Sequence, residues 1–127
     1  MIILNQDGFG RLAVLADTEM TEEDADRLLV RPAVDAGVDI LDWCILTTGQ
    51  HNCRTRHNRA FRGDGQGREI DRQVGKVVMH YNAQPNDLLD VVIARAHAAG
   101  IRVFGNIRLN HGALNTERLL ACPGKNF

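Results

Sequence analysis

The chain has 127 residues and a formal net charge of −1 at pH 7, from 15 Lys and Arg against 16 Asp and Glu. This length predicts one domain, and an apolar content of 44% is enough for a hydrophobic core. Because the net charge is close to zero, the composition excludes a protein whose whole surface attracts nucleic acid or membranes. Any such partner would have to be recognised by a local patch.

Features that would direct the chain to a membrane or out of the cell are not evident in the sequence. The longest apolar runs, Met1–Leu4 and Leu12–Ala16, are far shorter than the roughly 20 residues that span a bilayer. The first run leads directly into Asn5-Gln6-Asp7-Gly8, without the pattern of an export leader. The cysteines lack the spacing of a disulfide framework, so we expect a cytoplasmic protein in a reducing compartment. They are Cys44, Cys53 and Cys122.

The first predicted elements are a strand, an undefined segment and a helix. Met1–Leu4 is predicted to be a buried strand because turn-forming residues close a short β-prone run. Phe9–Asp17 is compatible with a loop or a short strand. Thr21-Glu22-Glu23-Asp24 predicts a helix start, since a hydroxyl three residues before a carboxylate forms a capping box. Pro32 should kink or end that helix, and Gly37 should end the short turn after it.

The middle of the chain combines a clear strand with a long polar segment. Val38–Leu46 is rich in β-forming residues and predicts a strand. The Arg-rich and Gly-rich segment that follows, at about 49–68, is much longer than the usual connection of about 2–6 residues. It has almost nothing to bury, which indicates a functional or disordered loop. Arg68–Ala83 then predicts a helix, or a strand over Lys76–Met79.

The last third of the chain contains a typical helix-to-strand unit. A helix is predicted to start near Pro85 or Asp87 and to end at Gly100, and a strand is predicted at Ile101–Leu109. A glycine that ends a helix and turns the chain into a strand is characteristic of parallel sheets. One more short helix is predicted at Glu117–Ala121.

Strands that alternate with helices predict an α/β fold whose parallel strands are joined by crossover helices. Three parallel strands form a poor sheet by themselves, because such sheets need cover on both faces. A complete (β/α)₈ barrel needs about 250 residues, roughly twice this length. The sequence therefore predicts a single partial domain over residues 1–127, equivalent to the first three strands of an incomplete (β/α)₈ barrel.

Polar residues at the predicted strand ends are candidates for a binding site, because ligands of βα folds bind beyond the carboxyl ends of the strands. Carboxylate, amide and guanidinium groups form directional hydrogen bonds with sugar hydroxyls, and an indole offers an apolar face. The competing interpretation is that these residues are caps and core residues. The candidate substrate-binding residues are Asn5, Asp7, Trp43, His51, Arg108, Asn110 and His111, and the same rim includes Gln6, Asp42, Cys44, Thr47, Thr48 and Gln50.

Short motifs in these regions resemble a known family. The sequence is similar to the N-terminal part of the glycoside-hydrolase-like TIM-barrel proteins, family-10-like hydrolases of environmental bacteria. The resemblance implies a carbohydrate-active hydrolase with a barrel fold and a carbohydrate as its partner. The motifs that carry it are Leu4-Asn5-Gln6-Asp7-Gly8, Leu41-Asp42-Trp43-Cys44, Ala96-His97-Ala98-Ala99-Gly100-Ile101 and Ile107-Arg108-Leu109-Asn110.

The third strand end departs from the family pattern. A similar strand end in such proteins reads Arg-Met-Asn-Asp and then His, so Arg108 and Asn110 match, whereas His111 stands where an acid is expected. Glycoside hydrolysis usually needs two carboxylates, which the resemblance places on later strands. For Asp7 and Asp42 a cap or a supporting role is favoured over catalysis. We therefore expect a chain that contributes sugar-binding residues and is not catalytically complete.

Metal-binding and cysteine-based chemistry find little support in the sequence. Cys44, His51, Cys53 and His57 could be imagined as zinc ligands, but their spacing matches no standard zinc pattern. A nucleophilic cysteine would need an activating histidine, and the spacing singles out no such pair. We expect no metal and no cofactor.

An alternative function is a non-enzymatic binding module that uses the Arg-rich loop. The segment 54–72 has six arginines against three carboxylates, a local charge of +3. Such a loop could bind phosphate, an acidic glycan or nucleic acid. Nucleic acid is disfavoured among these because only Phe61 is available to stack on bases. The arginines are Arg54, Arg56, Arg59, Arg62, Arg68 and Arg72.

The edges of the predicted sheet suggest one further kind of partner. Unpaired edge strands can pair with another chain. The outer strands therefore predict a homo-oligomer or a second chain that completes the barrel.

Overall fold

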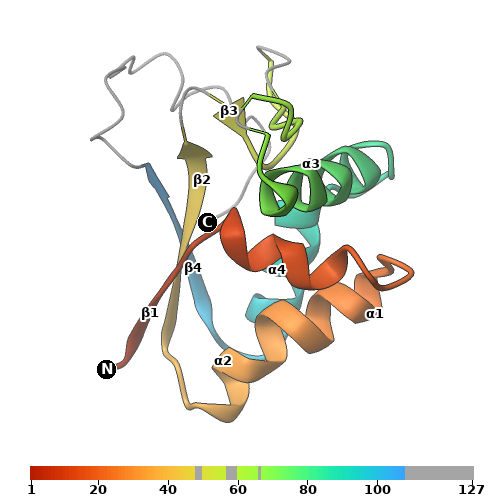
Figure 1. Ribbon diagram of the computed structural model, residues 1–127. Helices are drawn as coiled ribbons and strands as arrows, with labels where there is room; N and C mark the ends of the chain where they lie inside the picture. The colour runs from red at the N-terminus through yellow and green to blue at the C-terminus, as the bar shows by residue number, and fades with distance from the viewer. Residues whose placement is uncertain (48–49, 57–59, 66, 108–127) are drawn as a thin grey trace.

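The central feature of the computed structural model is a sheet whose described helices all lie on one face (Figure 1). The structure describes residues 1–47, 50–56, 60–65 and 67–107. The strands are β1 (Ile3–Gln6), β2 (Ile40–Thr47), β3 (Gln50–His51) and β4 (Arg102–Ile107). The helices are η1 (Gly10–Leu15), α1 (Glu22–Ala25), η2 (Asp26–Val30), α2 (Arg31–Asp35), α3 (Glu69–Asn82) and α4 (Leu88–Ala98).

The sheet is parallel apart from β3. β2 lies at its centre and pairs in parallel with β1 on one side and with β4 on the other. β3 continues from β2 and pairs antiparallel with its end, through Leu46 with His51 and Thr47 with Gln50. The predicted α/β fold with parallel strands and connecting helices is therefore confirmed.

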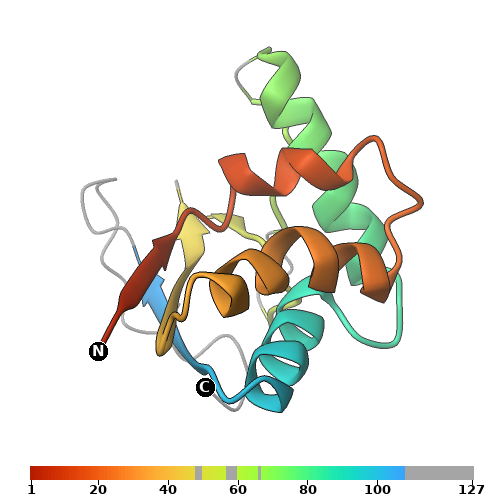
Figure 2. The same ribbon diagram turned by 90° about the horizontal axis from the view of Figure 1, so that it is seen from below.

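The two faces of the sheet have different surroundings. Leu41 is in register with Leu4 on β1 and Val103 on β4, and this row belongs to the hydrophobic core. Side chains alternate between the faces of a sheet, so the next row, which contains Asp42, points to the other face. Figure 2 shows the helices gathered on one side of the strands. We call the face on which none of the described helices lies the open face.

The first crossover connection follows the capping and proline signals of the sequence. Thr21 and Asp24 form the expected capping box, in which each side chain accepts a hydrogen bond from the other's backbone N–H. Pro32 has no N–H to donate to the carbonyl of Leu28, and the Arg11 guanidinium donates to that oxygen instead, at 3.0 Å. The helix widens into the π-helical turn η2 just before the proline. Pro32 does not end the helix, which continues as α2 to Asp35, and the irregularity expected near Val30–Arg31 takes the form of this π-helical turn.

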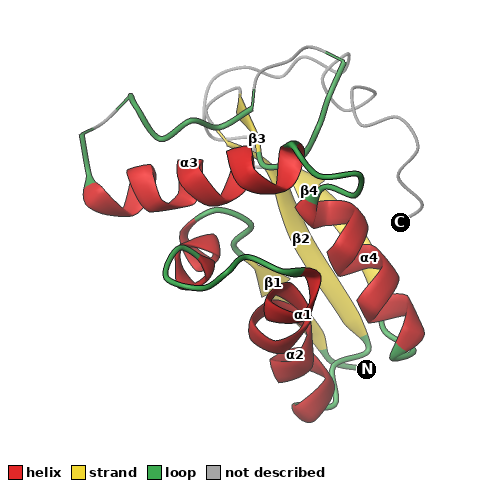
Figure 3. Ribbon diagram, turned by 90° about the vertical axis from the view of Figure 1, so that its right-hand side faces the viewer, coloured by secondary structure: helices red, strands yellow, loops and turns green. Residues whose placement is uncertain are grey.

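Polar side chains of α3 fix the loop between η1 and α1. Lys76 Nζ donates to the carbonyl of Ala16 at 2.8 Å, and the Tyr81 hydroxyl donates to the carbonyl of Thr21 at 2.7 Å. Burial raises the pKa of Tyr81, so its phenol stays protonated and remains a donor. Figure 3, viewed from the helical side, shows α3 and α4 beside the shorter α1 and α2.

Several predicted elements need correction. The helix over Arg68–Ala83 exists as α3, and the alternative strand at Lys76–Met79 is wrong because these residues form one amphipathic helix. The alternative strand within Phe9–Asp17 is also wrong, since η1 is a 3₁₀ helix that buries Leu12 and Leu15. The predicted helix at Glu117–Ala121 lies outside the described residues.

The polar segment after β2 is anchored more firmly than its composition suggests. Phe61 packs edge-on against Phe9, with ring centroids 5.4 Å apart. A Cβ on Gly75 in α3 would lie 2.0 Å from the carbonyl oxygen of Arg62, and one on Gly63 would lie 1.8 Å from that of Asp71. The expectation that this segment has almost nothing to bury is therefore wrong, because its backbone packs directly on α3.

Candidate functional site

The predicted site residues of the first strand have different roles. Asn5 is exposed on the open face, and its Nδ2 donates to Asp42 Oδ2 at 2.7 Å. Asp7 is half-buried and its Oδ1 accepts from the backbone N–H of Phe9 at 3.0 Å, which is a turn-capping contact. A Cβ on the neighbouring Gly8 would lie 1.9 Å from the carbonyl oxygen of Cys44, so the glycine is required by packing. Asn5 is therefore the more accessible of the two candidates.

Trp43 and His51 lie in the interior, and each side chain is only 1% exposed. Trp43 is in the row of β2 that faces the helices, and its indole is part of the hydrophobic core. His51 lies on β3, where its backbone carbonyl accepts from the N–H of Phe61 at 2.8 Å. A sugar ring has no access to either side chain in this structure, so neither Trp43 nor His51 can contact a sugar as predicted.

The remaining predicted site residues, Arg108, Asn110 and His111, lie outside the described residues, as does Thr48. Among the other rim residues, Cys44 is buried, and Gln6 and Gln50 are half-buried. Asp42 is half-buried beside Asn5. The structure thus brings together Asn5 and Asp42 among the described candidates.

A row of polar and aromatic side chains crosses the open face. Asn5, Asp42 and Phe104 are register partners on β1, β2 and β4, so they share one face of the sheet. The Phe104 side chain is 49% exposed, which is unusual for a large apolar residue in the middle of a strand. Adjacent strands lie about 4.8 Å apart, so the row extends over roughly 10 Å. We call Asn5, Asp42, Phe104 and Asn106 the open-face strip.

Asn106 adds a second amide to this strip. It lies two residues after Phe104 on β4, in register with Cys44, and therefore on the same face. Its Nδ2 is buried and has no hydrogen-bond partner among the residues that the structure describes. A buried donor without a partner costs about 1–3 kcal/mol, which a ligand acceptor would relieve. The strip thus offers two amides, a carboxylate and an aromatic face.

Phe104 and Asn106 were not among the predicted site residues. Both fall inside the predicted strand Ile101–Leu109, whereas the polar candidates are residues at strand ends. The alternation of β4 could have indicated them, since Val103 and Phe104 must face opposite sides. Which side is open depends on the position of the helices, and that is a property of the tertiary structure.

Arginines of the long polar segment contact the protein itself. Arg68 forms a bidentate pair with Asp71, with distances of 2.7 and 2.9 Å, and the adjacent guanidinium lowers the pKa of that carboxyl. Arg72 pairs with Glu69 at 2.6 Å. Arg54 lies 3.6 Å from Asp90. These contacts reduce the positive charge that the segment can offer to a polyanion.

The described part of the chain has neither a metal-binding cluster nor a membrane-spanning helix. No group of three or more His, Cys, Asp or Glu side chains in it could hold a metal ion. His57, one of the four residues considered as zinc ligands, lies outside that part. None of the helices over residues 1–107 that the structure describes is long and apolar enough to cross a membrane.

Comparison of the sequence with models of known protein families and with curated proteins found no match. The assignment of a function therefore depends on the geometry of the site and on the motifs of the sequence.

Proposed function

We propose that the chain is the N-terminal portion of a carbohydrate-active hydrolase, and that its open-face strip binds a neutral sugar. The observation that carries this proposal is the hydrogen-bonded pair of Asn5 and Asp42 beside an exposed aromatic ring in the same row. An amide both donates hydrogen bonds to hydroxyls and accepts them, a carboxylate accepts them, and an aromatic face packs against the C–H groups of a sugar ring.

The order of the strands supports the same proposal. The three parallel strands β1, β2 and β4 lie side by side in the sheet in the order in which they follow one another in the chain, as the strands of a (β/α)₈ barrel do, and the described helices lie on one face. In such a barrel the face without helices lines the interior, and its upper end forms the active site. The open-face strip lies on that face, and Asn5 and Asn106, each the next-to-last residue of its strand, are its residues nearest that end.

The chain is proposed to bind sugar without completing the catalytic machinery. Glycoside hydrolysis usually needs two carboxylates about 5–9.5 Å apart across the scissile bond. On the strip, Asp42 is the carboxylate, and Asp7 serves as a turn cap. Further βα units, from a longer chain or from a second chain, would supply the catalytic acids and continue the sheet from β4.

Calorimetric titration with neutral oligosaccharides tests the sugar-binding proposal. The ligands are hexasaccharides of β-1,4-linked glucose, xylose and mannose, and the variants are Phe104→Ala and Asp42→Asn. Loss of the aromatic contact should weaken binding by about tenfold, equivalent to ~1.4 kcal/mol. Ile70→Ala is the matched control, because Ile70 is an exposed apolar residue on α3 at 45% exposure.

Two results would contradict the proposal. One is the absence of binding by all three hexasaccharides. The other is equal affinity of Phe104→Ala and Ile70→Ala. Binding of a sulfated polysaccharide in place of the neutral sugars, weakening steeply with salt, would favour the alternative of an arginine-based module.

A further inference from the structure

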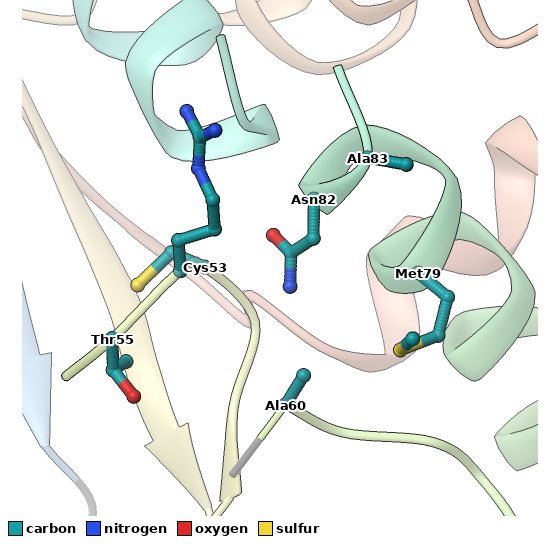
Figure 4. A pocket seen from close by; sticks show the side chains of 7 residues that line it. Cys53, Thr55, Ala60, Met79, Asn82 and Ala83 are labelled. Carbon is teal, nitrogen blue, oxygen red and sulfur yellow. The ribbon is translucent and has the colours of Figure 1, made fainter. Parts of the chain in front are cut away.

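A pocket between the segment after β3 and the end of α3 is not used by the proposed function. Its volume is about 360 Å³, within the usual range for small-molecule sites of about 300–1,000 Å³. Figure 4 shows the Asn82 amide extending from the end of α3 into the space beside Cys53, with Met79 and Ala60 around it. The described residues that line the pocket are Cys53, Arg54, Thr55, Ala60, Met79, Asn82 and Ala83. None of them belongs to the open-face strip.

Two residues that line this pocket, one in the segment after β3 and one in α3, carry oxygen atoms without hydrogen bonds to the described residues. Thr55 Oγ1 and Asn82 Oδ1 are both buried, and neither has a partner among the described residues. Each such group costs free energy unless a ligand or water satisfies it. Both oxygens accept hydrogen bonds, and the hydroxyl can also donate one. The pocket is therefore complementary to a molecule that carries several hydroxyl donors.

The charge of the pocket favours a neutral ligand. Arg54 is the charged residue of the described lining, and it disfavours a cation. Its guanidinium is already committed to the carbonyls of Gln84 and Pro85, at 3.2 and 2.5 Å, which leaves little for an anion. The other walls are apolar or weakly polar, including Met79 and Ala83.

The wall that carries Arg54 is held in place before any ligand binds. Asp87, the N-cap of α4, is fully buried, and its Oδ2 accepts from the backbone N–H of Arg54 at 2.8 Å. The Asp87 Oδ1 accepts from the N–H of Asp90 at 3.0 Å, which closes a capping box. Cys53, next to Arg54, is buried in the core. A preformed pocket loses less conformational entropy on binding than a flexible one.

We propose that this pocket binds a small, neutral, hydroxyl-rich molecule, with Thr55 and Asn82 as its hydrogen-bonding residues. The ligand is a polyol of about the size of a monosaccharide. The site is independent of the open-face strip, because the two surfaces share no residue and the pocket does not need an oligosaccharide chain.

The three methionines allow the pocket to be followed beside two reference signals from outside it. The whole chain is labelled with ¹³C at the methionine methyl groups and titrated with myo-inositol, glucose and glycerol. Met79 lines the pocket, Met1 lies at the start of β1, and Met20 precedes α1. The proposal predicts a saturable shift of the Met79 signal with myo-inositol or glucose, while Met20 stays unchanged. The readout does not depend on the proposed function.

Two variants and a second ligand test which groups of the pocket form hydrogen bonds with the polyol. Thr55→Val and Asn82→Leu remove one acceptor each at similar volume, and each should weaken binding at least about threefold. Phe104→Ala should leave the Met79 shift unchanged. Cyclohexanol has a similar ring with one hydroxyl, so it should shift Met79 far less than myo-inositol does. Circular dichroism checks that each variant is folded, and either variant is sufficient for the test.

Three results would overturn the proposal. The first is a Met79 signal that does not respond to the polyols. The second is an equal response to cyclohexanol and myo-inositol, which would show an apolar pocket. The third is unchanged affinity in whichever of Thr55→Val and Asn82→Leu is folded.

Discussion

The two faces of the sheet are made from neighbouring residues of the same strands, yet they serve different purposes. On the helical face, Leu41 and Trp43 are at most 1% exposed and belong to a continuous core. On the open face, between these two residues, Asp42 forms a hydrogen bond with Asn5, and Phe104 in the same row is half-exposed. The side chains of Leu41 and Trp43 are buried against the helices, whereas the open face exposes hydrogen-bonding groups and an aromatic ring to solvent.

This difference separates residues that stabilise the fold from residues that can bind a ligand. A buried aliphatic side chain contributes through its many contacts, which a substitution cannot replace. An exposed aromatic residue contributes less to folding, so its position in a strand calls for another explanation. We therefore expect substitutions on the two faces to affect different measurements.

The largest expected effect is on the helical face. Leu41→Ala should lower the free energy of unfolding by about 2–5 kcal/mol, because it leaves a cavity in the core. Phe104→Ala should cost less than about 1.5 kcal/mol, since half of its ring is already in contact with solvent. Urea denaturation of both variants measures the difference. Equal losses would show that the open face is packed as tightly as the helical face.

The packing of the long polar segment on α3 gives the next effect. Alanine in place of glycine inside a helix normally stabilises it by about 1 kcal/mol. For Gly75→Ala we expect a loss of about 1–3 kcal/mol, because the new Cβ would clash with the backbone of Arg62. Thermal and urea denaturation measure this change in the free energy of unfolding. Gly65→Ala is the control, with a change within about 0.5 kcal/mol, as a Cβ there meets nothing within 4 Å. A more stable Gly75→Ala would contradict the account.

The two capping boxes should differ because one is buried. Asp87→Ala deprives the N–H groups of Arg54 and Asp90 of their acceptor, and should cost about 1–3 kcal/mol. Thr21→Ala on α1 should cost about 1 kcal/mol or less, since water can replace the hydroxyl at this exposed position. Chemical denaturation measures the free energy of unfolding of both variants. A larger loss for Thr21→Ala than for Asp87→Ala would contradict this expectation.

Surface ion pairs at helix starts should give the smallest effect, visible in the pH dependence. Hydrogen bonds from Arg68 lower the pKa of Asp71, and those from Arg27 and Thr21 lower the pKa of Asp24. A carboxyl with a lowered pKa in the folded state stabilises it above the unfolded pKa of about 3.9. This stabilisation is lost as the pH falls through the folded value.

Melting temperatures between pH 7 and pH 2 test this effect. In Asp71→Asn and in Arg68→Gln the decline below about pH 4 should be shallower than in the unmodified chain. Combining the two substitutions should change the slope no further, because both remove the same interaction. A steeper decline in either variant would show that the pair does not act in this way.

Local signals in the sequence predicted the elements well. The capping box at Thr21, the break at Pro32 and the end of α4 at Gly100 depend on residues within one turn of the chain. For the region of α3 the sequence is compatible with a helix or a short strand, because its apolar residues are separated by charges and by Gly75. Contacts with η1 and with the polar segment resolve that ambiguity, and they are distant in sequence.

The candidate site was predicted less completely, for a physical reason. Residue type made Trp43 a candidate sugar platform with a core position as the competing interpretation, and the structure places it in the core, whereas the exposed ring among the described residues is that of Phe104. Period-two alternation tells which residues of a strand share a face, and not which face is covered. That choice is made by the helices, so it could be read only from the tertiary structure. Asn5, a candidate just after the predicted first strand, lies within β1 and is exposed.

Nuclear magnetic resonance mapping of an oligosaccharide titration tests the central claim most directly. The ¹⁵N-labelled chain is titrated with whichever neutral hexasaccharide binds, or with all three at millimolar concentration. The account predicts that the amide signals of Asn5, Asp42 and Phe104 shift together, while those of Leu89 and Val92 in α4 stay unchanged. Shifts confined to the helical side, or no shift with any of the three sugars, would contradict the claim that the open face is the sugar-binding surface.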